Sequence, residues 1–568
     1  MISGIIFDGS SQSQNSPKEM TEMKSILTLP IVELIENYRL SIASKNKEGA
    51  ATIHVDEIAS KIARFYEQIR KVVDWKEENV LRRSAILRVL KRSLIAKISS
   101  LSEIFPTDLN YMAESLTLEL IRGGHLPNDE IPVEQIGVVA QTLKKYVYIL
   151  EKAPFTENKN EPLLKKKVNF YNWILEIAAC EIENILAPPD KENALIKAMT
   201  LLMSERIQVI SDKPLGEPEK RTLTYIAVCR TLFDLDESYI TFHMLKYHYP
   251  QWTNPPKEFI DQAAREIFNI AKRIEKYLKH PLSRDFFNIC EKTDTVFTLL
   301  GDLLDYYKKY PSKITPVISN QNYLSKLFTQ FYNKRLKSLK TRLFRLAIFS
   351  TLSVFLSNWV TYFIVEVPLA HLFYEGFSFW AMAVDFVIPS IAMFVLVVII
   401  KPPSSENLSK VLQVSYKFIY REQEKETFQI KTKKRRRFFF DLIIGFFYLV
   451  ACFFSFGIVA WVFYIAKIPK TSVVMDTMMI AVNVFAALVI RNKARELTVQ
   501  EKGSFTEFVL DAVSVPVARV GNFFANKWRE YNVITVFFNY FIEMPFVTFI
   551  EFVETWRQFL KDEKADIH

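Results

Sequence analysis

Four polar side chains interrupt the longest apolar stretches of this sequence, and they offer its most distinctive chemistry. They are Asn358, Asp385, Asp476 and Asn483. A carboxylate in hydrocarbon is costly unless it is protonated or paired, so Asp385 should face other helices and accept a hydrogen bond. Asn358 and Asn483 are suitable donors. The set predicts either a cluster that responds to protons or cations, or interhelical hydrogen bonds that only hold the helices together.

The short motifs that mark most catalytic and cofactor sites are absent from the sequence. It has no glycine-rich phosphate loop, no serine-nucleophile motif and no cysteine–histidine spacing that suits zinc. His243 and His248 stand five residues apart, which does not place both on one helical face. Asp234 and Asp236, in FDLDE, are typical of a helix start rather than a metal site. We therefore expect no enzyme activity, no cofactor and no metal.

Four apolar stretches must position the four polar residues. They cover residues 346–365, 376–400, 442–466 and 471–490, and Asp385 and Asp476 are the only charged residues in them. At a rise of about 1.5 Å per residue, each stretch can cross a hydrocarbon core of about 30 Å. Backbone groups in lipid must be paired within the segment, which favours helices. The sequence predicts a four-helix transmembrane bundle within a domain of residues 333–496.

The net charge of +10 is distributed unevenly around these stretches. Lys and Arg crowd the residues before the first stretch, the linker 401–437 and the residues after the fourth, whereas 366–375 has none. Cytoplasmic loops of membrane proteins carry this excess, so both termini should be cytoplasmic in a multi-pass protein. The four polar residues then lie about 8–18 Å from the outer side. The linker ends in a run of basic residues, which we interpret as a topology anchor; contact with anionic lipid is the alternative. The run consists of Lys431, Lys433, Lys434, Arg435, Arg436 and Arg437.

The chain before residue 333 reads as helices almost throughout. We expect a flexible N-terminus over 1–17 and a cytoplasmic helical domain over 18–332, with no alternating strands. The helix that starts at Asn322 should continue into the first apolar stretch. The fold class is therefore all-α, with an irregular bundle or a short solenoid. The predicted helices cover 55–73, 77–100, 108–121, 133–151, 163–186, 191–210, 219–233, 257–278, 286–309 and 322–344.

Two further segments carry amphipathic patterns. In the linker, an apolar stripe predicts a helix docked on the helical domain, with membrane-surface contact as the alternative. The aromatic-rich tail, 497–568, is expected to form broken amphipathic helices at the inner interface. Val533–Ile550 is disfavoured as a fifth span because Glu543 and Pro545 lie inside it. The stripe in the linker consists of Leu408, Val411, Leu412, Ser415, Phe418 and Ile419.

One helix of the N-terminal domain is strongly basic. Leu81–Ser100 carries six Lys and Arg residues and no acidic residue. Nucleic acid or anionic lipid could bind such a face. A solvated face partly paired with acidic neighbours is favoured, since no aromatic residues alternate with the charges to stack on bases. Nucleic acid is therefore not an expected partner.

Several stretches resemble uncharacterised bacterial multi-pass membrane proteins with a helical cytoplasmic domain. They are LELIRGGHLPNDEIP (118–132), SRDFFNICEKTDTVFTLL (283–300), IIKPPSSEN (399–407) and VPVARVGNFFANKWREYNVI (515–534). The resemblance implies one architecture over most of the chain and location in a bacterial inner membrane. It implies no activity and no site residues.

Two functions of different classes remain. The first is a non-enzymatic membrane-anchored scaffold, whose helical domain recruits a protein partner, with homo-oligomers as a possible form. The second is a small-solute or ion transporter or channel that uses the four polar residues. Both require the lipid bilayer as a partner.

Overall fold

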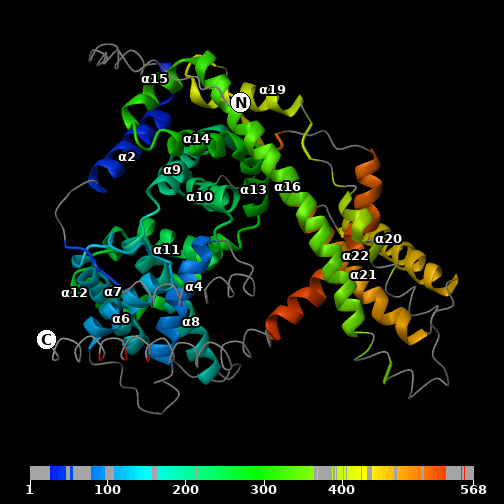
Figure 1. The fold of residues 1–568 in the computed structure, drawn as a ribbon, viewed down its shortest axis with the longest axis horizontal. Helices are drawn as coiled ribbons and strands as arrows, with labels where there is room; N and C mark the ends of the chain where they lie inside the picture. Colours follow the sequence, from blue (N-terminus) through cyan, green and yellow to red (C-terminus); the bar gives the residue numbers. More distant parts are fainter. Residues whose placement is uncertain are drawn as a thin grey trace. The chain divides into compact units, whose positions relative to one another are not determined.

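The computed structural model is predominantly helical, which confirms the all-α class (Figure 1). It describes residues 26–45, 51–55, 78–95, 108–155, 163–210, 215–361, most of 387–431, 438–465, 470–499 and 505–531, and a few single residues beside these ranges. The predicted N-terminal region 1–17, the helix over 55–73 and the segment Val533–Ile550 lie outside the described residues. The chain divides into two compact units, each described here by itself.

Unit 2 combines residues 36–204, 216–290 and 533–568. Its centre is α8 (Leu163–Leu186), which packs against α4 (Glu78–Leu90), α7 (Glu134–Lys152) and α11 (Glu237–His248). Around them lie the π-helical turn η1 (Lys91–Ile95), α6 (Leu109–Arg122), α9 (Asp190–Arg206), α10 (Glu217–Phe233), the short η2 (Pro250–Trp252), α12 (Lys257–Leu278) and α13 (Ser283–Glu291).

Local sequence explains where these helices begin and which face they bury. The carboxylate of Asp108 accepts hydrogen bonds from the backbone amides of Asn110 and Tyr111 at 3.0 Å, and this caps α6. In α12, an apolar stripe at helical spacing is buried, from Ala263 to Ile274. The predicted helix 286–309 is wrong as a single element. It divides into α13 and α14 (Asp294–Tyr306), because the chain turns before Asp294.

Unit 1 contains residues 1–35, 205–215 and 291–532. Its elements after α14 are η3 (Pro311–Lys313), α15 (Ile314–Ser319), α16 (Gln321–Thr361), α19 (Glu406–Ile419), α20 (Phe438–Ile465), α21 (Lys470–Ala494) and α22 (Phe505–Tyr531). The N-terminal α2 (Leu29–Lys45) begins in this unit. As predicted, α16 continues into the first apolar stretch as one helix of 41 residues. The predicted boundary between 332 and 333 falls inside that helix and stays a prediction.

The linker helix α19 is docked on α14 and α16, as the favoured alternative predicted. Its buried residues are Asn407, Val411, Val414, Ser415, Phe418 and Ile419, so Leu408 and Leu412 lie at the edge of the buried face. The expectation of no strands is wrong at two places. Strand β1 (Ile207–Ile210), predicted as the end of a helix, pairs in parallel with β2 (Phe428–Lys431).

The apolar helices of unit 1 pack together just after the basic residues of α16. Ala347 of α16 lies in one cluster with Met393, Val397 and, on α21, Ala487 and Ile490. Within the described residues, one helical segment is long and apolar enough to span a membrane, Thr477–Ala494, and Gly445–Ile458 is a shorter apolar run. The four-span bundle is not confirmed by this measure.

Candidate functional site

The middle of α8 is the most chemically unusual part of unit 2. From Ile177 to Glu183 every residue is buried, so the helix has no solvent face there. A helix of this kind normally carries only apolar residues, yet this one carries Glu181 and Glu183. Each carboxylate must therefore find partners on neighbouring helices.

Glu181 forms a closed network with α7 and η2. The Lys145 ammonium donates to both carboxylate oxygens at 2.6 and 2.7 Å and to the Trp252 carbonyl at 2.8 Å. The Tyr146 hydroxyl donates to Oε2 of Glu181 at 2.5 Å and accepts from Nε1 of Trp252 at 3.1 Å. The side chains of Lys145 and Glu181 are only 5% and 1% exposed. Every donor of the Lys145 ammonium is therefore used inside the protein.

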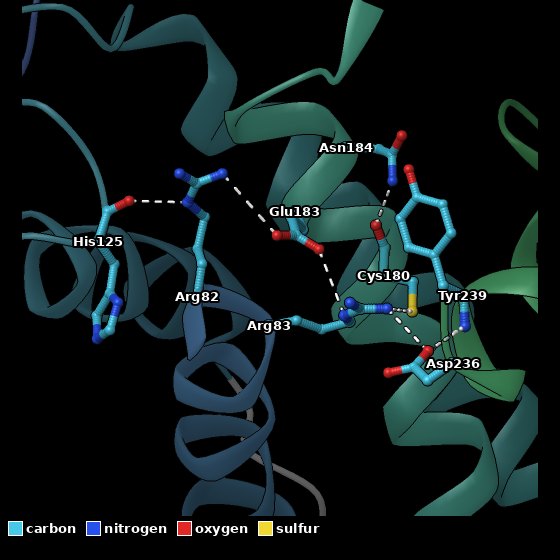
Figure 2. A network of polar contacts seen from close by, with 8 residues as sticks. All are labelled: Arg82, Arg83, His125, Cys180, Glu183, Asn184, Asp236 and Tyr239. Carbon is cyan, nitrogen blue, oxygen red and sulfur yellow. Dashed lines mark hydrogen bonds and ion pairs between the residues drawn. The ribbon is translucent and has the colours of Figure 1, made fainter. Parts of the chain in front are cut away.

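Glu183, two residues further along α8, is approached by two arginines of α4 (Figure 2). Nε of Arg83 lies 3.5 Å from Oε2 of Glu183, and Nη1 of Arg82 lies 3.9 Å from Oε1. Arg83 also donates through Nη1 to Oδ1 of Asp236 at 2.9 Å and lies over the Tyr239 ring. Arg82 donates to the backbone carbonyl of His125. These contacts fix α4, α8 and α11 to one another.

Burial sets the protonation states in this second network. Desolvation raises the pKa of Glu183 to about 7, although Arg83 and Arg82 act against it. Desolvation likewise raises the pKa of the Cys180 thiol, so the thiolate that a nucleophile requires is disfavoured. His243, enclosed by Tyr239 and Phe242, has its pKa lowered to about 3 by burial. The network holds a titratable carboxyl group but no activated nucleophile.

The structure assigns structural roles to the residues that the sequence left between two interpretations. Asp236 caps α11 by accepting from the backbone amide of Tyr239 at 2.9 Å, and Asp234 has φ of 45° at the end of α10. His243 is an internal residue of α11, enclosed by aromatic rings. In the described part of the chain, no group of three or more His, Cys, Asp or Glu residues is placed to hold a metal ion.

The basic helix is only partly the solvated face that the sequence favoured. Arg92 pairs with Glu119 at 2.5 Å near the surface, but Arg82 and Arg83 point into the protein. The buried pairing of these two arginines, and that of Lys145 with Glu181, was not predicted from the sequence. A usable signal exists: in IAACEIENIL (177–186), two carboxylates interrupt an apolar run and require buried cations.

Of the four polar residues in the apolar stretches, the structure describes the side chain of Asn483. It lies on α21 and is 7% exposed, and among the described residues its Nδ2 atom has no hydrogen-bond partner. The backbone at Asn358 belongs to α16 and that at Asp476 to α21. The side chains of both residues, and Asp385 entirely, lie outside the described residues, so the cluster stays a prediction. Of the basic run, Lys431 is an exposed residue at the end of β2, and Lys433–Arg437 lie outside the described part.

A second polar centre, unforeseen from the sequence, lies in unit 1 at Asn407. Its Nδ2 atom donates to the Tyr332 hydroxyl at 2.9 Å and to the Leu497 carbonyl at 2.6 Å. Its Oδ1 atom accepts from the Val499 amide at 3.0 Å. The side chain therefore ties α16, the start of α19 and the segment after α21. We call this group the Asn407 junction.

Comparison with protein-family models, curated proteins and solved structures finds no match for this chain.

Proposed function

We propose that this chain is a multi-pass membrane protein with a cytoplasmic N-terminus, whose helical domain recruits a protein partner to the inner face of the membrane. The observation that carries the membrane part is the surface of α20. Its large apolar side chains are exposed on most of the helix circumference, with Phe453 and Tyr464 being 73% and 81% exposed. The others include Phe446, Phe447, Leu449, Phe454 and Trp461.

Lipid is the occupant that suits this surface. Water-soluble proteins seldom expose a continuous apolar area of this kind, whereas helices in a bilayer do so on every side not covered by another helix. The side of α20 that carries Tyr448, Cys452 and Ser455 is less exposed, and α20 packs against α22. One covered side and a surrounding apolar surface support a helix at the edge of a membrane bundle.

The Asn407 junction supports the proposed topology. It ties α16 at Tyr332, fourteen residues before the first apolar stretch, to the start of α19 after the second stretch and to the backbone just after α21. The chain therefore leaves the junction along α16, returns at α19, leaves again before α20 and returns after α21. Two outward passages and two returns agree with four spans. The basic residues of α16, Lys334, Lys337, Lys340 and Arg345 among them, favour the cytoplasmic side for the junction.

The recruiting role is supported by how unit 2 uses its charges. The buried groups around Glu181 and Glu183 bind one another and fix helices, and this suits a rigid domain that presents a surface. The lowered reactivity of Cys180 and the absence of catalytic motifs from the sequence agree with this role. A protein partner, a second copy of the chain included, is the expected ligand.

Two experiments on the full chain test the proposal. Alkaline carbonate washing of membranes should leave the protein in the pellet, and its release into the supernatant would overturn the membrane part. Affinity purification in mild detergent, after crosslinking in cells, should retain a stoichiometric protein partner or a second copy. Recovery of the chain alone, as a monomer, would overturn the recruiting part.

Transport is the second candidate, and Asn483 is the observation in its favour. An amide donor buried without a partner inside apolar helices is costly unless it binds a group that enters and leaves. In liposomes, transport predicts ion or solute flux that Asp385→Asn abolishes. Equal flux from the variant, or none from the natural protein, would contradict it.

A further inference from the structure

Helix α22 follows α21 in the opposite direction with a constant register. Arg491 of α21 donates to Asp511 of α22. Deeper along both helices, Ala481 and Val484 pack with Val517 and Ala518. Contacts further along α22 involve residues earlier in α21, so the two helices are antiparallel.

The closest approach of the two helices occurs at Gly521. A Cβ atom at this position would lie under 3.0 Å from the backbone of Ala481. Ser514, which is 7% exposed, and Ala518 are also small and buried on α22. Small residues let helix backbones approach closely, which is the main mode of helix association in lipid. This contact therefore suits a pair of membrane helices.

The register also gives the depth that α22 reaches. Arg491 lies at the basic, inner end of the predicted fourth span, so Asp511 lies at that level too. Gly521 is ten residues further, about 15 Å along the axis, which is half of a hydrocarbon core of about 30 Å. If the proposed function is right about the membrane, α22 cannot lie flat on its surface while it keeps these contacts.

We propose that α22 is a membrane-embedded helix that reaches at least mid-depth beside α21, and that its Arg519 binds the phosphate of an anionic lipid of the inner leaflet. This proposal rests on the membrane part of the proposed function. It replaces the prediction of an interfacial tail for residues 505–531. Hydropathy conceals α22 because Asp511, Arg519 and Lys527 interrupt it.

Arg519 lies on the most exposed side of α22. This side carries Ala512, Val515, Arg519 and Phe523, all exposed, and only the arginine is polar. The guanidinium lies 5.0 Å from the centre of the Tyr448 ring of α20, and within the described residues it forms no hydrogen bond or ion pair. Its hydrogen-bond donors are therefore available to a ligand.

An anionic lipid is the ligand that fits this position. Arg519 is eight residues beyond Asp511, about 12 Å deep. Helical side chains point toward the N-terminus of their helix, which is the inner end for both α20 and α22. Arg519 and Tyr448 thus lean toward the inner headgroups, where a guanidinium can bind phosphate in a bidentate manner. The exposed apolar surfaces of α20 and α22 continue on either side for the acyl chains.

Cysteine accessibility in the full-length protein in native membranes tests the position of α22. The probes are Phe523→Cys on α22, the natural Cys452 on α20 and Gln413→Cys on the exposed side of α19, each treated with a water-soluble maleimide. Cys180, Cys229 and Cys290 are buried and stay silent. Gln413→Cys should react, and Cys452 and Phe523→Cys should react more slowly by on the order of tenfold, because hydrocarbon suppresses the thiolate.

The outcomes separate the two proposals. Fast labelling of Phe523→Cys with protection of Cys452 would overturn the embedding of α22 and leave the membrane proposal standing. Fast labelling of both would overturn the membrane proposal itself.

The lipid is tested with nanodiscs of phosphatidylglycerol or phosphatidylcholine. Phosphatidylglycerol should raise the thermal midpoint of the natural protein and co-purify with it. Arg519→Ala should lose both effects, whereas Lys527→Ala, an exposed cation further along α22, should keep them. Equal thermal midpoints in the two lipids would overturn the lipid assignment. So would an equally large rise in the midpoint when inorganic phosphate is added to phosphatidylcholine nanodiscs.

Discussion

The amide of Asn407 donates to the hydroxyl of Tyr332 at 2.9 Å, and through this bond the helix after the second apolar stretch is fixed to the helix that enters the first. The same side chain uses its other atoms on Leu497 and Val499. One buried amide therefore satisfies three partners from two distant parts of the chain.

Asn407→Ala should lower the free energy of unfolding by about 2–3 kcal/mol, because it removes the three buried hydrogen bonds of this side chain. The thermal midpoint of the purified protein in mild detergent, followed by far-UV circular dichroism, measures the effect. Gln413→Ala, on the exposed side of the same helix, is the matched control and should change the free energy by less than about 0.5 kcal/mol. Equal midpoints for the two variants would contradict the assignment.

Lys145→Met should destabilise the protein by about 3–5 kcal/mol, because it leaves the Glu181 carboxylate buried without a cation. Lys144→Met, one position earlier on α7 and exposed, should be nearly neutral. Adding Glu181→Gln to Lys145→Met should restore part of the midpoint, since the uncompensated charge is removed. A double variant as unstable as the single one would show that packing, not charge, dominates at this site.

Glu183 should make stability depend on pH. Its pKa in the folded protein is raised to about 7, above the 4.5 of the free side chain. The protonated form is therefore favoured by folding, and the stability it provides is complete below pH 4.5 and is lost as the pH rises to about 7. Glu183→Gln cannot ionise, so the thermal midpoint of the natural protein should fall relative to this variant over that window.

Glu275→Gln is the control for this titration, because Glu275 is exposed beside Lys279 on α12. Its midpoint should follow the natural protein at every pH. Parallel curves for Glu183→Gln and the natural protein would mean that Glu183 is ionised throughout the window.

Gly521→Ala should separate α21 from α22 and cost about 1–3 kcal/mol, because the new Cβ atom overlaps the backbone of Ala481. Gly457→Ala on α20 is the matched control, since a Cβ atom there would meet nothing within 4 Å. The control should be neutral or slightly stabilising, as alanine favours a helix by up to about 1 kcal/mol. A midpoint for Gly521→Ala at or above that of Gly457→Ala would contradict the close contact.

Periodicity predicted much of this fold, but long-range pairing limited the rest. The helices 163–186 and 257–278 were predicted to the residue, because apolar spacing and flanking prolines define them locally. Strand β1 was assigned to a helix, since Ile207–Ile210 becomes a strand only through pairing with Phe428–Lys431. The packing of α22 on α21 was not predicted for a similar reason, since the contact of Gly521 with Ala481 joins positions forty residues apart.

The polar side chains likewise divide into those whose role the local sequence predicts and those whose role depends on distant partners. Helix caps such as Asp236 are local and were recognised. The partners of Glu181 and Glu183 come from α4, α7, α11 and η2, so a single sequence shows that buried cations are needed but not which ones. For Asn407, nothing in the surrounding PPSSEN distinguishes it from an ordinary residue of a helix start.

The parallel pairing of β1 with β2 has a consequence for synthesis on the ribosome. More than two hundred residues separate Ile207 from its partner Phe428. Strand β1 therefore emerges early and cannot pair until α16, the second apolar stretch and α19 have all been made. The helices α4 to α13 are complete well before then, whereas unit 1, to which the early strand belongs, must wait for these later segments.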